Sequence, residues 1–238
     1  MLLLAVGPSA RPAVGQGIAD NSFLIEEAYN QERGVVQHIS AWQRALRSTA
    51  WAFTFTQEWP LVTQTHQLSY TIPLQRTARP STTGLGDAAL NYRYQLRAGA
   101  RVAIAPRLSL ILPTGSAARG LGTGHVGAQL NWPVSVRLGS AFVSHWNAGV
   151  TLVPRVTTYN LGASVIWLVD PAFNVLCEVV WTDQTAGTHD FVVNPGVRWA
   201  HNFASGLQIV PGVAFPDGRA AFLYLSFEHR FRSEIDPK

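Results

Sequence analysis

The chain has 238 residues, of which 47% are hydrophobic and only 13% are charged, and its formal net charge at pH 7 is +4. The charged fraction is about half that of typical soluble domains, yet no apolar run reaches the roughly 18 residues of a membrane helix. The cations are scattered singly, which argues against a nucleic-acid partner. The single cysteine, Cys177, excludes an intramolecular disulfide framework and any multi-cysteine metal site.

Residues 1–17, MLLLAVGPSARPAVGQG, resemble a secretory signal, because a short apolar run is followed by small residues. The segment lacks a basic start, and its apolar run is shorter than the usual 7–15 residues. An atypical or truncated signal and a tail without targeting function both stay open.

Residues 18–33 differ in kind from the remainder of the chain. Asn21 or Ser22 can cap a short helix, and acidic side chains in its first turns would suit the helix dipole. We expect a short helical segment on the periplasmic side that plugs or caps the lumen of a barrel, with a plain linker as the alternative. The expected plug residues are Phe23, Glu26, Glu27 and Tyr29.

From residue 34 to residue 231 the chain alternates between apolar and polar positions, the period of a β-strand. In AAFLYLSFEHRF, for example, Leu223, Leu225 and Phe227 fall on one face, and Ser226 and Glu228 fall on the other. Segments of about ten residues with an apolar face and aromatic ends are typical of membrane-spanning strands. About twelve such segments are centred near residues 39, 52, 68, 91, 106, 130, 146, 164, 176, 195, 209 and 225.

An even number of strands fits a closed antiparallel barrel with both chain ends on one side of the membrane. The predicted connections also alternate in length: RAGA, LGS, DPA and NFAS are short, and QRTARPSTT, PTGSAARGLGT and DQTAGTH are long. Two connections break this alternation, a longer second one around EWPLVTQ and a tight last outer turn at PDG. A soluble β-sandwich is the alternative, but its outer surface would need far more charge. The sequence therefore predicts an all-β protein, a transmembrane antiparallel barrel over residues 34–231, with a tail over residues 232–238.

The stretch GLGTGHVG, residues 120–127, matches the G-x-G-x-x-G pattern of dinucleotide-binding folds. That pattern carries its mechanism only where a strand precedes it and a helix follows it. Here strand alternation resumes at once, with Val126, Leu130 and Trp132 on the apolar face. We therefore assign Gly120, Gly122 and Gly124 to an outer loop, where chain reversal needs positive φ.

Four stretches of the sequence resemble, in order, the family of outer-membrane channels labelled "MetA-pathway of phenol degradation", whose members are described as transporters. The resemblance covers most of the chain and implies an outer-membrane barrel with a transport role. The matching stretches are NSFLIEEAYNQERGVVQH (21–38), GLGDAALNYRYQL (84–96), LPTGSAARGLGTG (112–124) and HWNAGVTLVP (145–154).

The polar faces of the strands would line the lumen of such a barrel. An excess of arginine among them would favour anions, as charged rings do in channels, although Arg–Glu pairing that merely fills a narrow barrel is an equal alternative. The predicted pore-lining residues are Glu58, Arg93, Arg97, Arg107, His125, Gln129, His145, Asn147, Glu178, Arg198, Glu228 and Arg230.

A catalytic site and a metal site are both disfavoured by the sequence. Ser144 and His145 are adjacent on a strand, so they point to opposite faces and cannot form the dyad of an outer-membrane phospholipase. The seven histidines show no H-x-x-x-H or H-E-x-x-H spacing. We therefore expect no enzyme activity, no metal and no cofactor.

The sequence thus predicts a passive channel in a bacterial outer membrane for small molecules, with aromatic and anionic solutes as candidates. We expect the channel to be a monomer or a weak oligomer, with membrane lipid and a small solute as its partners. The rival hypothesis is a plugged barrel that serves as a structural or interaction platform for a periplasmic or surface protein.

Overall fold

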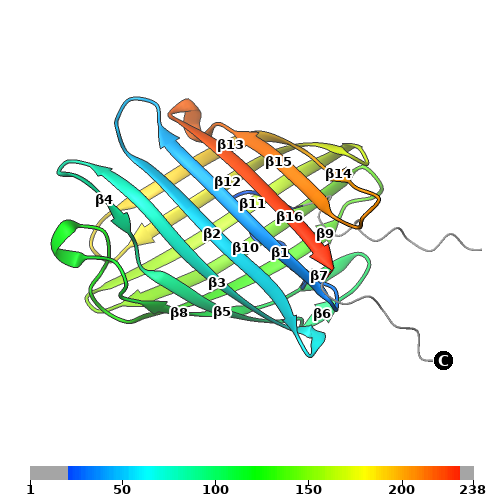
Figure 1. The fold of residues 1–238 in the computed structure, drawn as a ribbon, viewed down its shortest axis with the longest axis horizontal. Helices are drawn as coiled ribbons and strands as arrows, with labels where there is room; N and C mark the ends of the chain where they lie inside the picture. The colour runs from blue at the N-terminus through cyan, green and yellow to red at the C-terminus, as the bar shows by residue number, and fades with distance from the viewer. Residues whose placement is uncertain (1–20, 231–238) are drawn as a thin grey trace, which may run out of the picture.

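Strand pairing closes the chain into a barrel. The first strand, β1 (Val35–Ala45), pairs with the last, β16 (Ala220–Arg230), and each remaining wall strand pairs antiparallel with its sequence neighbours (Figure 1). The computed structural model describes residues 21–230. The predicted antiparallel barrel of twelve strands is confirmed.

Some of the twelve wall strands are interrupted by short breaks and consist of more than one β-segment. β4, β5 and β6 follow one another along one wall strand, as do β7 and β8, and β14 continues β13. The remaining bounds are β2 (Trp51–Leu61), β3 (Thr63–Ala78), β4 (Ser81–Leu85), β5 (Ala88–Tyr94), β6 (Arg97–Ala98), β7 (Val102–Ile104), β8 (Arg107–Leu112), β9 (Gly127–Arg137), β10 (Phe142–Val153), β11 (Val156–Asp170), β12 (Phe173–Gln184), β13 (His189–Trp199), β14 (His201–Asn202) and β15 (Gln208–Ala214).

The barrel is apolar outside and polar inside, the reverse of a water-soluble protein. Along each strand, successive side chains point to opposite faces, so one register places most apolar side chains outward and most polar side chains inward. Exposed outward side chains include Leu90, Tyr92, Leu108, Leu130, Trp132, Trp146, Leu161, Trp167, Phe191, Trp199, Leu223 and Leu225. Buried polar side chains include Gln37, Glu58, Gln67, Asn91, Arg93, Asn131, His145, Asn147, Glu178, Asn194, Arg198 and Ser226.

The two ends of the barrel differ. We call the end where β1 begins and β16 finishes the terminus end, and the opposite end, which carries residues 113–126, the loop end. Between Ala117 and Arg119 this long connection forms a short 3-10 helix. No described helix is long and apolar enough to cross a membrane.

The glycine-rich stretch lies in the long connection, and β9 follows it at once, so the dinucleotide-binding interpretation is excluded. Gly120 and Gly124 have positive φ, at 68° and 73°, as expected of a reversing chain. Gly122 is needed for a different reason, because a Cβ there would lie 2.3 Å from an Asp87 carboxylate oxygen. That carboxylate accepts hydrogen bonds from the N–H groups of Gly115 and Thr123.

Two predicted connections are wrong, because strand pairing continues through them. A single residue, Val62, separates β2 from β3, where a longer connection was expected. Only residues 79–80 separate β3 from β4, although QRTARPSTT was expected to be a long loop. The β3–β4 hairpin is polar on both faces, so the hydropathy pattern stops there while the backbone hydrogen bonds continue.

The helix expected before the first strand is also wrong, since residues 21–33 contain no helical turn. The predicted signal segment (residues 1–17), the first three residues of the predicted plug segment (18–20) and the predicted C-terminal tail (232–238) lie outside the described residues.

Candidate functional site

The N-terminal segment, residues 21–33, lies against inward-facing side chains of the barrel wall. Its backbone N–H groups donate to these side chains rather than to carbonyls of its own chain, which explains why no helix forms. The N–H of Glu26 donates to Asn147 Oδ1 at 2.8 Å, that of Ala28 to Ser135 Oγ at 2.7 Å, and that of Gln31 to Gln67 Oε1 at 2.6 Å.

Glu178 on β12 binds three backbone N–H groups of the N-terminal segment. Its Oε1 accepts from the N–H groups of Phe23, Leu24 and Ile25 at 2.9, 2.7 and 3.0 Å. Its Oε2 accepts from the amide of Asn194 at 2.7 Å, and the Glu178 side chain is fully buried. Three consecutive N–H groups on one carboxylate oxygen form a charge-assisted contact of the kind that orders a loop.

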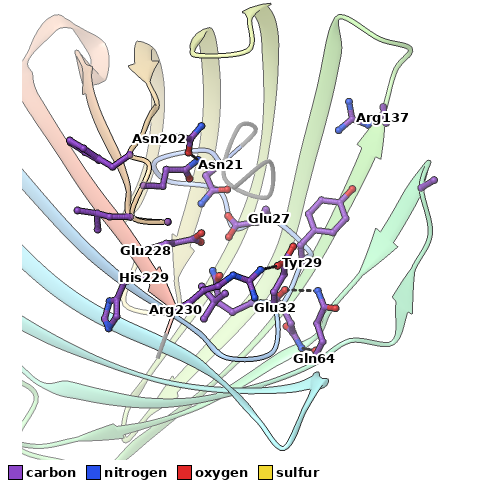
Figure 2. Close-up of a pocket in the computed structure, with 18 of the residues that line it drawn as sticks. Asn21, Glu27, Tyr29, Glu32, Gln64, Arg137, Asn202, Glu228, His229 and Arg230 are labelled. Carbon is purple, nitrogen blue, oxygen red and sulfur yellow. Dashed lines mark hydrogen bonds and ion pairs between the residues drawn. The ribbon is translucent and has the colours of Figure 1, made fainter. Parts of the chain in front are cut away.

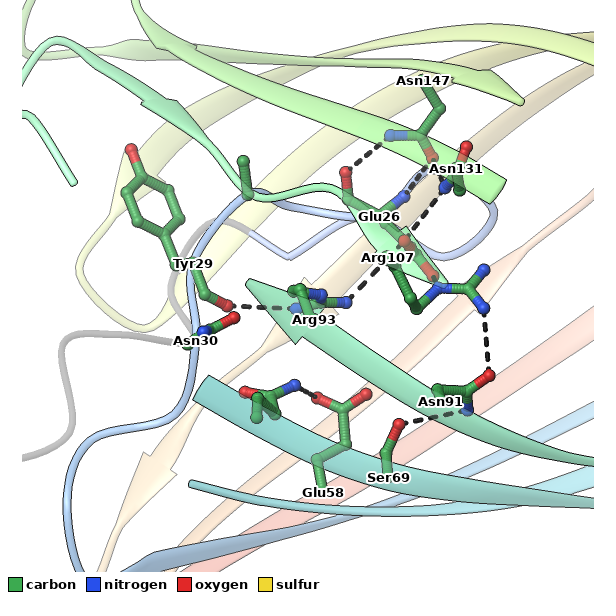
Figure 3. A network of polar contacts seen from close by, with 12 residues as sticks. Glu26, Tyr29, Asn30, Glu58, Ser69, Asn91, Arg93, Arg107, Asn131 and Asn147 are labelled. Atoms are coloured by element: carbon green, nitrogen blue, oxygen red, sulfur yellow. Dashed lines mark hydrogen bonds and ion pairs between the residues drawn. The ribbon is translucent and has the colours of Figure 1, made fainter. Parts of the chain in front are cut away.

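Glu26 is held by cations from neighbouring strands (Figure 3). Its carboxylate lies 2.5 Å from Arg107 Nε on β8 and 3.8 Å from Arg93 Nη2 on β5, and it accepts from Asn131 Nδ2 on β9 at 2.9 Å. Burial alone would raise the pKa of Glu26, but the guanidiniums of Arg107 and Arg93 and the Asn131 amide outweigh it and hold the pKa below its ordinary value of 4.5. Glu26 is therefore a carboxylate at neutral pH.

The Phe23 ring packs against the barrel wall at two glycines, Gly196 and Gly212. Its ring centroid lies 5.5 Å from that of Phe222 and 5.3 Å from that of Tyr224, both on β16. A Cβ on Gly212 would lie 2.6 Å from two ring carbons of Phe23, and a Cβ on Gly196 would lie 2.7 Å from a third. The absence of side chains at these positions allows the ring to contact the wall directly.

Two cavities lie on either side of the segment, and both are lined in part by Asn21 and Glu27. The terminus-side cavity, of about 330 Å³, is bordered by Tyr29, Glu32 and Arg230 (Figure 2). The loop-side cavity, of about 350 Å³, is bordered by residues of the wall strands from β16 around to β9. The segment therefore separates two polar spaces within one barrel.

The structure brings most of the predicted lumen residues into these surroundings. Six of them, Glu58, Arg93, His145, Asn147, Glu178 and Arg198, are buried on the inner face. Arg107 and Gln129 line the loop-side cavity, and Glu228 and Arg230 line the terminus-side cavity.

Arg97 and His125 are not part of this polar network. Both are exposed at the ends of the barrel, because Arg97 lies beyond a break in its wall strand and His125 belongs to the long connection before β9.

All four predicted plug residues lie on the N-terminal segment. Phe23 and Glu26 make the contacts described above, and the carbonyl of Tyr29 accepts from Arg93 at 3.1 Å. Glu27 and Tyr29 border the terminus-side cavity.

Several contacts were missed from the sequence. Ser135 hydrogen-bonds His145 Nδ1 at 2.7 Å as well as Ala28, and the amide of Gln31 contacts Gln37. The inward position of Ser135 and Gln37 in their strands was the available signal. Nothing local in the sequence marks Gly212 as the seat of a ring about 190 residues away.

The serine next to His145 in the sequence and the serine hydrogen-bonded to it are both buried. Ser144 donates to the Ser164 carbonyl at 2.8 Å and points away from His145, as its adjacent position predicts. The Ser135–His145 pair is fully buried beneath Ala28. Within residues 21–230, no group of three or more His, Cys, Asp or Glu side chains could hold a metal ion.

Comparison with known proteins finds no matching family model and no curated relative. Solved structures do match the fold. The COG4313 outer membrane channel from Pseudomonas putida F1 is similar with a TM-score of 0.60 at 15% identity, covering 86% of this chain and 98% of that one. The KdgM porin has a TM-score of 0.57 at 8% identity and the NanC porin 0.56 at 7%; each covers 83% of this chain, with 99% and 100% of their own chains matched. The barrel is thus a fold shared with outer-membrane channels and porins.

Proposed function

We propose that the protein is a channel of a bacterial outer membrane that passes small solutes. The observation that carries this proposal is the inverted distribution of polarity, with large apolar side chains exposed on the outer face and buried polar side chains inside. A closed sheet leaves no unpaired strand edge, which is what a hydrocarbon environment demands. The likeness of the fold to porins and channels supports the same role.

We further propose that the N-terminal segment restricts passage by dividing the lumen. Its contacts run from Ser164 on β11 to Gln67 on β3, across the interior of the barrel. The two cavities end against the segment from opposite sides, so a solute that crosses the barrel must displace part of it. Transport then depends on how firmly the wall holds residues 21–33.

The solute class follows from the charges of the lumen. The loop-side cavity is bordered by the acids Glu26, Glu27 and Glu58 as well as by Arg93 and Arg107, and the two arginines are the groups that would attract an anion. One matching structure is a KdgM porin in complex with disordered oligogalacturonate, itself an anionic solute. The resemblance to the phenol-degradation channel family adds aromatic compounds as candidates, and we propose membership of that family on the stretches quoted above.

A second function is favoured by the density of contacts around the segment. Glu178, Asn147, Ser135 and Gln67 all accept from its backbone, which is more than a loosely held gate requires. A permanently closed barrel that presents a platform for a protein partner would use such contacts.

Swelling of liposomes that contain the purified protein separates the two functions. A channel predicts measurable entry of small solutes, faster for pentoses than for trisaccharides, and faster still for Glu178→Ala. A closed platform predicts no swelling for either protein. Asp170→Asn serves as the matched control, because Asp170 is exposed at a turn, accepts from the N–H of Ala172 and lines neither cavity.

A further inference from the structure

The loop-side cavity has two chemically different walls. On one side Arg93, Arg107, Asn91 and Gln129 present hydrogen-bonding groups from β5, β8 and β9. On the other side Phe23, Ile39, Ala41 and Tyr224 present apolar surface from the segment, β1 and β16. The cavity, of about 350 Å³, has the size of a small-molecule site, and polar side chains form most of its lining.

Glu26 already occupies the charged side of this cavity. Its carboxylate contacts Arg107 at 2.5 Å and Arg93 at 3.8 Å, and its side chain keeps 26% of its surface exposed. Arg107 also donates to Asn91 Oδ1 at 3.0 Å and to Gln129 Oε1 at 2.9 Å, so its guanidinium is fixed in place. A carboxylate is therefore the group for which the two arginines are arranged.

We propose that the loop-side cavity binds a small carboxylate with an apolar body, and that the bound carboxylate replaces Glu26 between Arg93 and Arg107. The apolar body then contacts Phe23, Ile39 and Tyr224 on the opposite wall. Solute binding and retention of the N-terminal segment compete for the same cations, so an arriving solute loosens the segment that blocks its path. This inference rests on the proposed function only where it concerns passage; binding itself is independent of it.

The replacement is favourable on charge grounds for both the two arginines and the displaced Glu26. The arginines keep an anionic partner, so neither buried cation is left uncompensated. The displaced Glu26 carboxylate stays at the edge of the loop-side cavity, where its side chain is already 26% exposed. By linkage, whatever loosens Glu26 must strengthen solute binding by the same factor.

Calorimetric titration of the purified protein in detergent with benzoate tests the binding. We expect benzoate to bind, benzamide and acetate to bind much more weakly, and Glu26→Gln to raise the benzoate affinity on the order of tenfold, because the internal competitor is neutral. Arg107→Gln is expected to abolish binding, and Glu32→Gln, which removes an acid outside the cavity, should leave it unchanged. Equal affinity of wild type and Glu26→Gln, or benzoate binding that survives Arg107→Gln, would overturn the proposal.

A second measurement detects displacement of the segment and does not depend on permeation. Ala28 is fully buried, so an Ala28→Cys substitution in a Cys177→Ser background places a hidden thiol on the segment. We expect saturating benzoate to accelerate its reaction with a water-soluble maleimide severalfold, with no acceleration by benzamide. An unchanged rate while benzoate is bound overturns the competition. Benzoate binding without any liposome swelling instead contradicts the channel function alone.

Discussion

Two arcs of the barrel wall hold the N-terminal segment by different forces. The polar arc, β5, β8, β9, β10 and β12, uses side-chain acceptors such as Glu178 and the arginines that bind Glu26 of the segment. The ring arc, β13, β15 and β16, uses shape, since Phe23 rests over Gly196 and Gly212 against Phe222 and Tyr224. Removing one partner from a buried polar contact leaves the other unsatisfied, whereas a lost ring contact costs only packing. The polar arc should therefore control whether the segment stays in place.

The largest effect is expected from Glu178→Ala. Three buried N–H groups lose their acceptor, and each unsatisfied group costs about 1–3 kcal/mol. Hydrogen-exchange protection of residues 23–25 should fall by about two orders of magnitude or more. Glu178→Gln keeps an acceptor oxygen and should lose less. Undiminished protection in Glu178→Ala would show that the polar arc does not hold the segment.

Gly212→Ala tests the ring arc and should have the next largest effect. The added methyl overlaps the Phe23 ring, and overpacking of this kind costs about 1–3 kcal/mol. The same exchange measurement should show reduced protection over residues 22–25. In a Phe23→Ala background the substitution should cost much less, because the ring it meets is gone. If Gly212→Ala lowers protection equally in the wild-type and Phe23→Ala proteins, the added methyl does not act through the Phe23 ring.

Acidification is expected to act through Glu26 more weakly. Its pKa is lowered in the docked segment, so its contribution to docking is complete well above pH 4.5 and is lost as the pH falls through that lowered pKa. The difference in planar-bilayer conductance between wild type and Glu26→Gln should therefore be largest at pH 7 and shrink below about pH 4.5. A difference that stays constant down to pH 3 would mean that docking does not depend on the ionisation of Glu26.

The smallest effect is expected from Glu32→Gln at the terminus end. The Arg230–Glu32 pair, 2.8 Å long, leaves 55% of the Glu32 side chain exposed. Exposed ion pairs of this kind contribute about 0.2–1 kcal/mol. Exchange protection of residues 23–25 should stay within error of wild type. A large change would show that contacts at the barrel rim, and not those of the polar arc, hold the N-terminal segment.

The strands were predictable because lipid and lumen impose a period of two on the sequence. Leu223 and Leu225 face outward and Ser226 faces inward, as the alternation in AAFLYLSFEHRF predicts. The prediction of strand ends failed where the sequence does not alternate between apolar and polar residues. The β3–β4 hairpin is polar on both faces, so its pairing up to Ala78 leaves no hydropathy pattern.

The conformation of the N-terminal segment could not be predicted from local pattern. A cap at Asn21 and acids in the first turn favour a helix in isolation. The acceptors that determine its conformation come from remote strands, since Glu178 lies 153 to 155 positions from the N–H groups it binds. The charges of Glu26, Arg93 and Arg107 were visible in the sequence, but their pairing depends on barrel closure.

The most direct test of the account replaces residues 22–31 by a glycine–serine sequence of equal length. The chain then keeps its length but loses Phe23, Glu26 and the backbone geometry that the wall binds. Single-channel conductance in planar bilayers, at neutral pH and matched salt, should rise severalfold over that of the wild-type protein. A conductance equal to wild type would contradict the claim that the N-terminal segment divides the lumen.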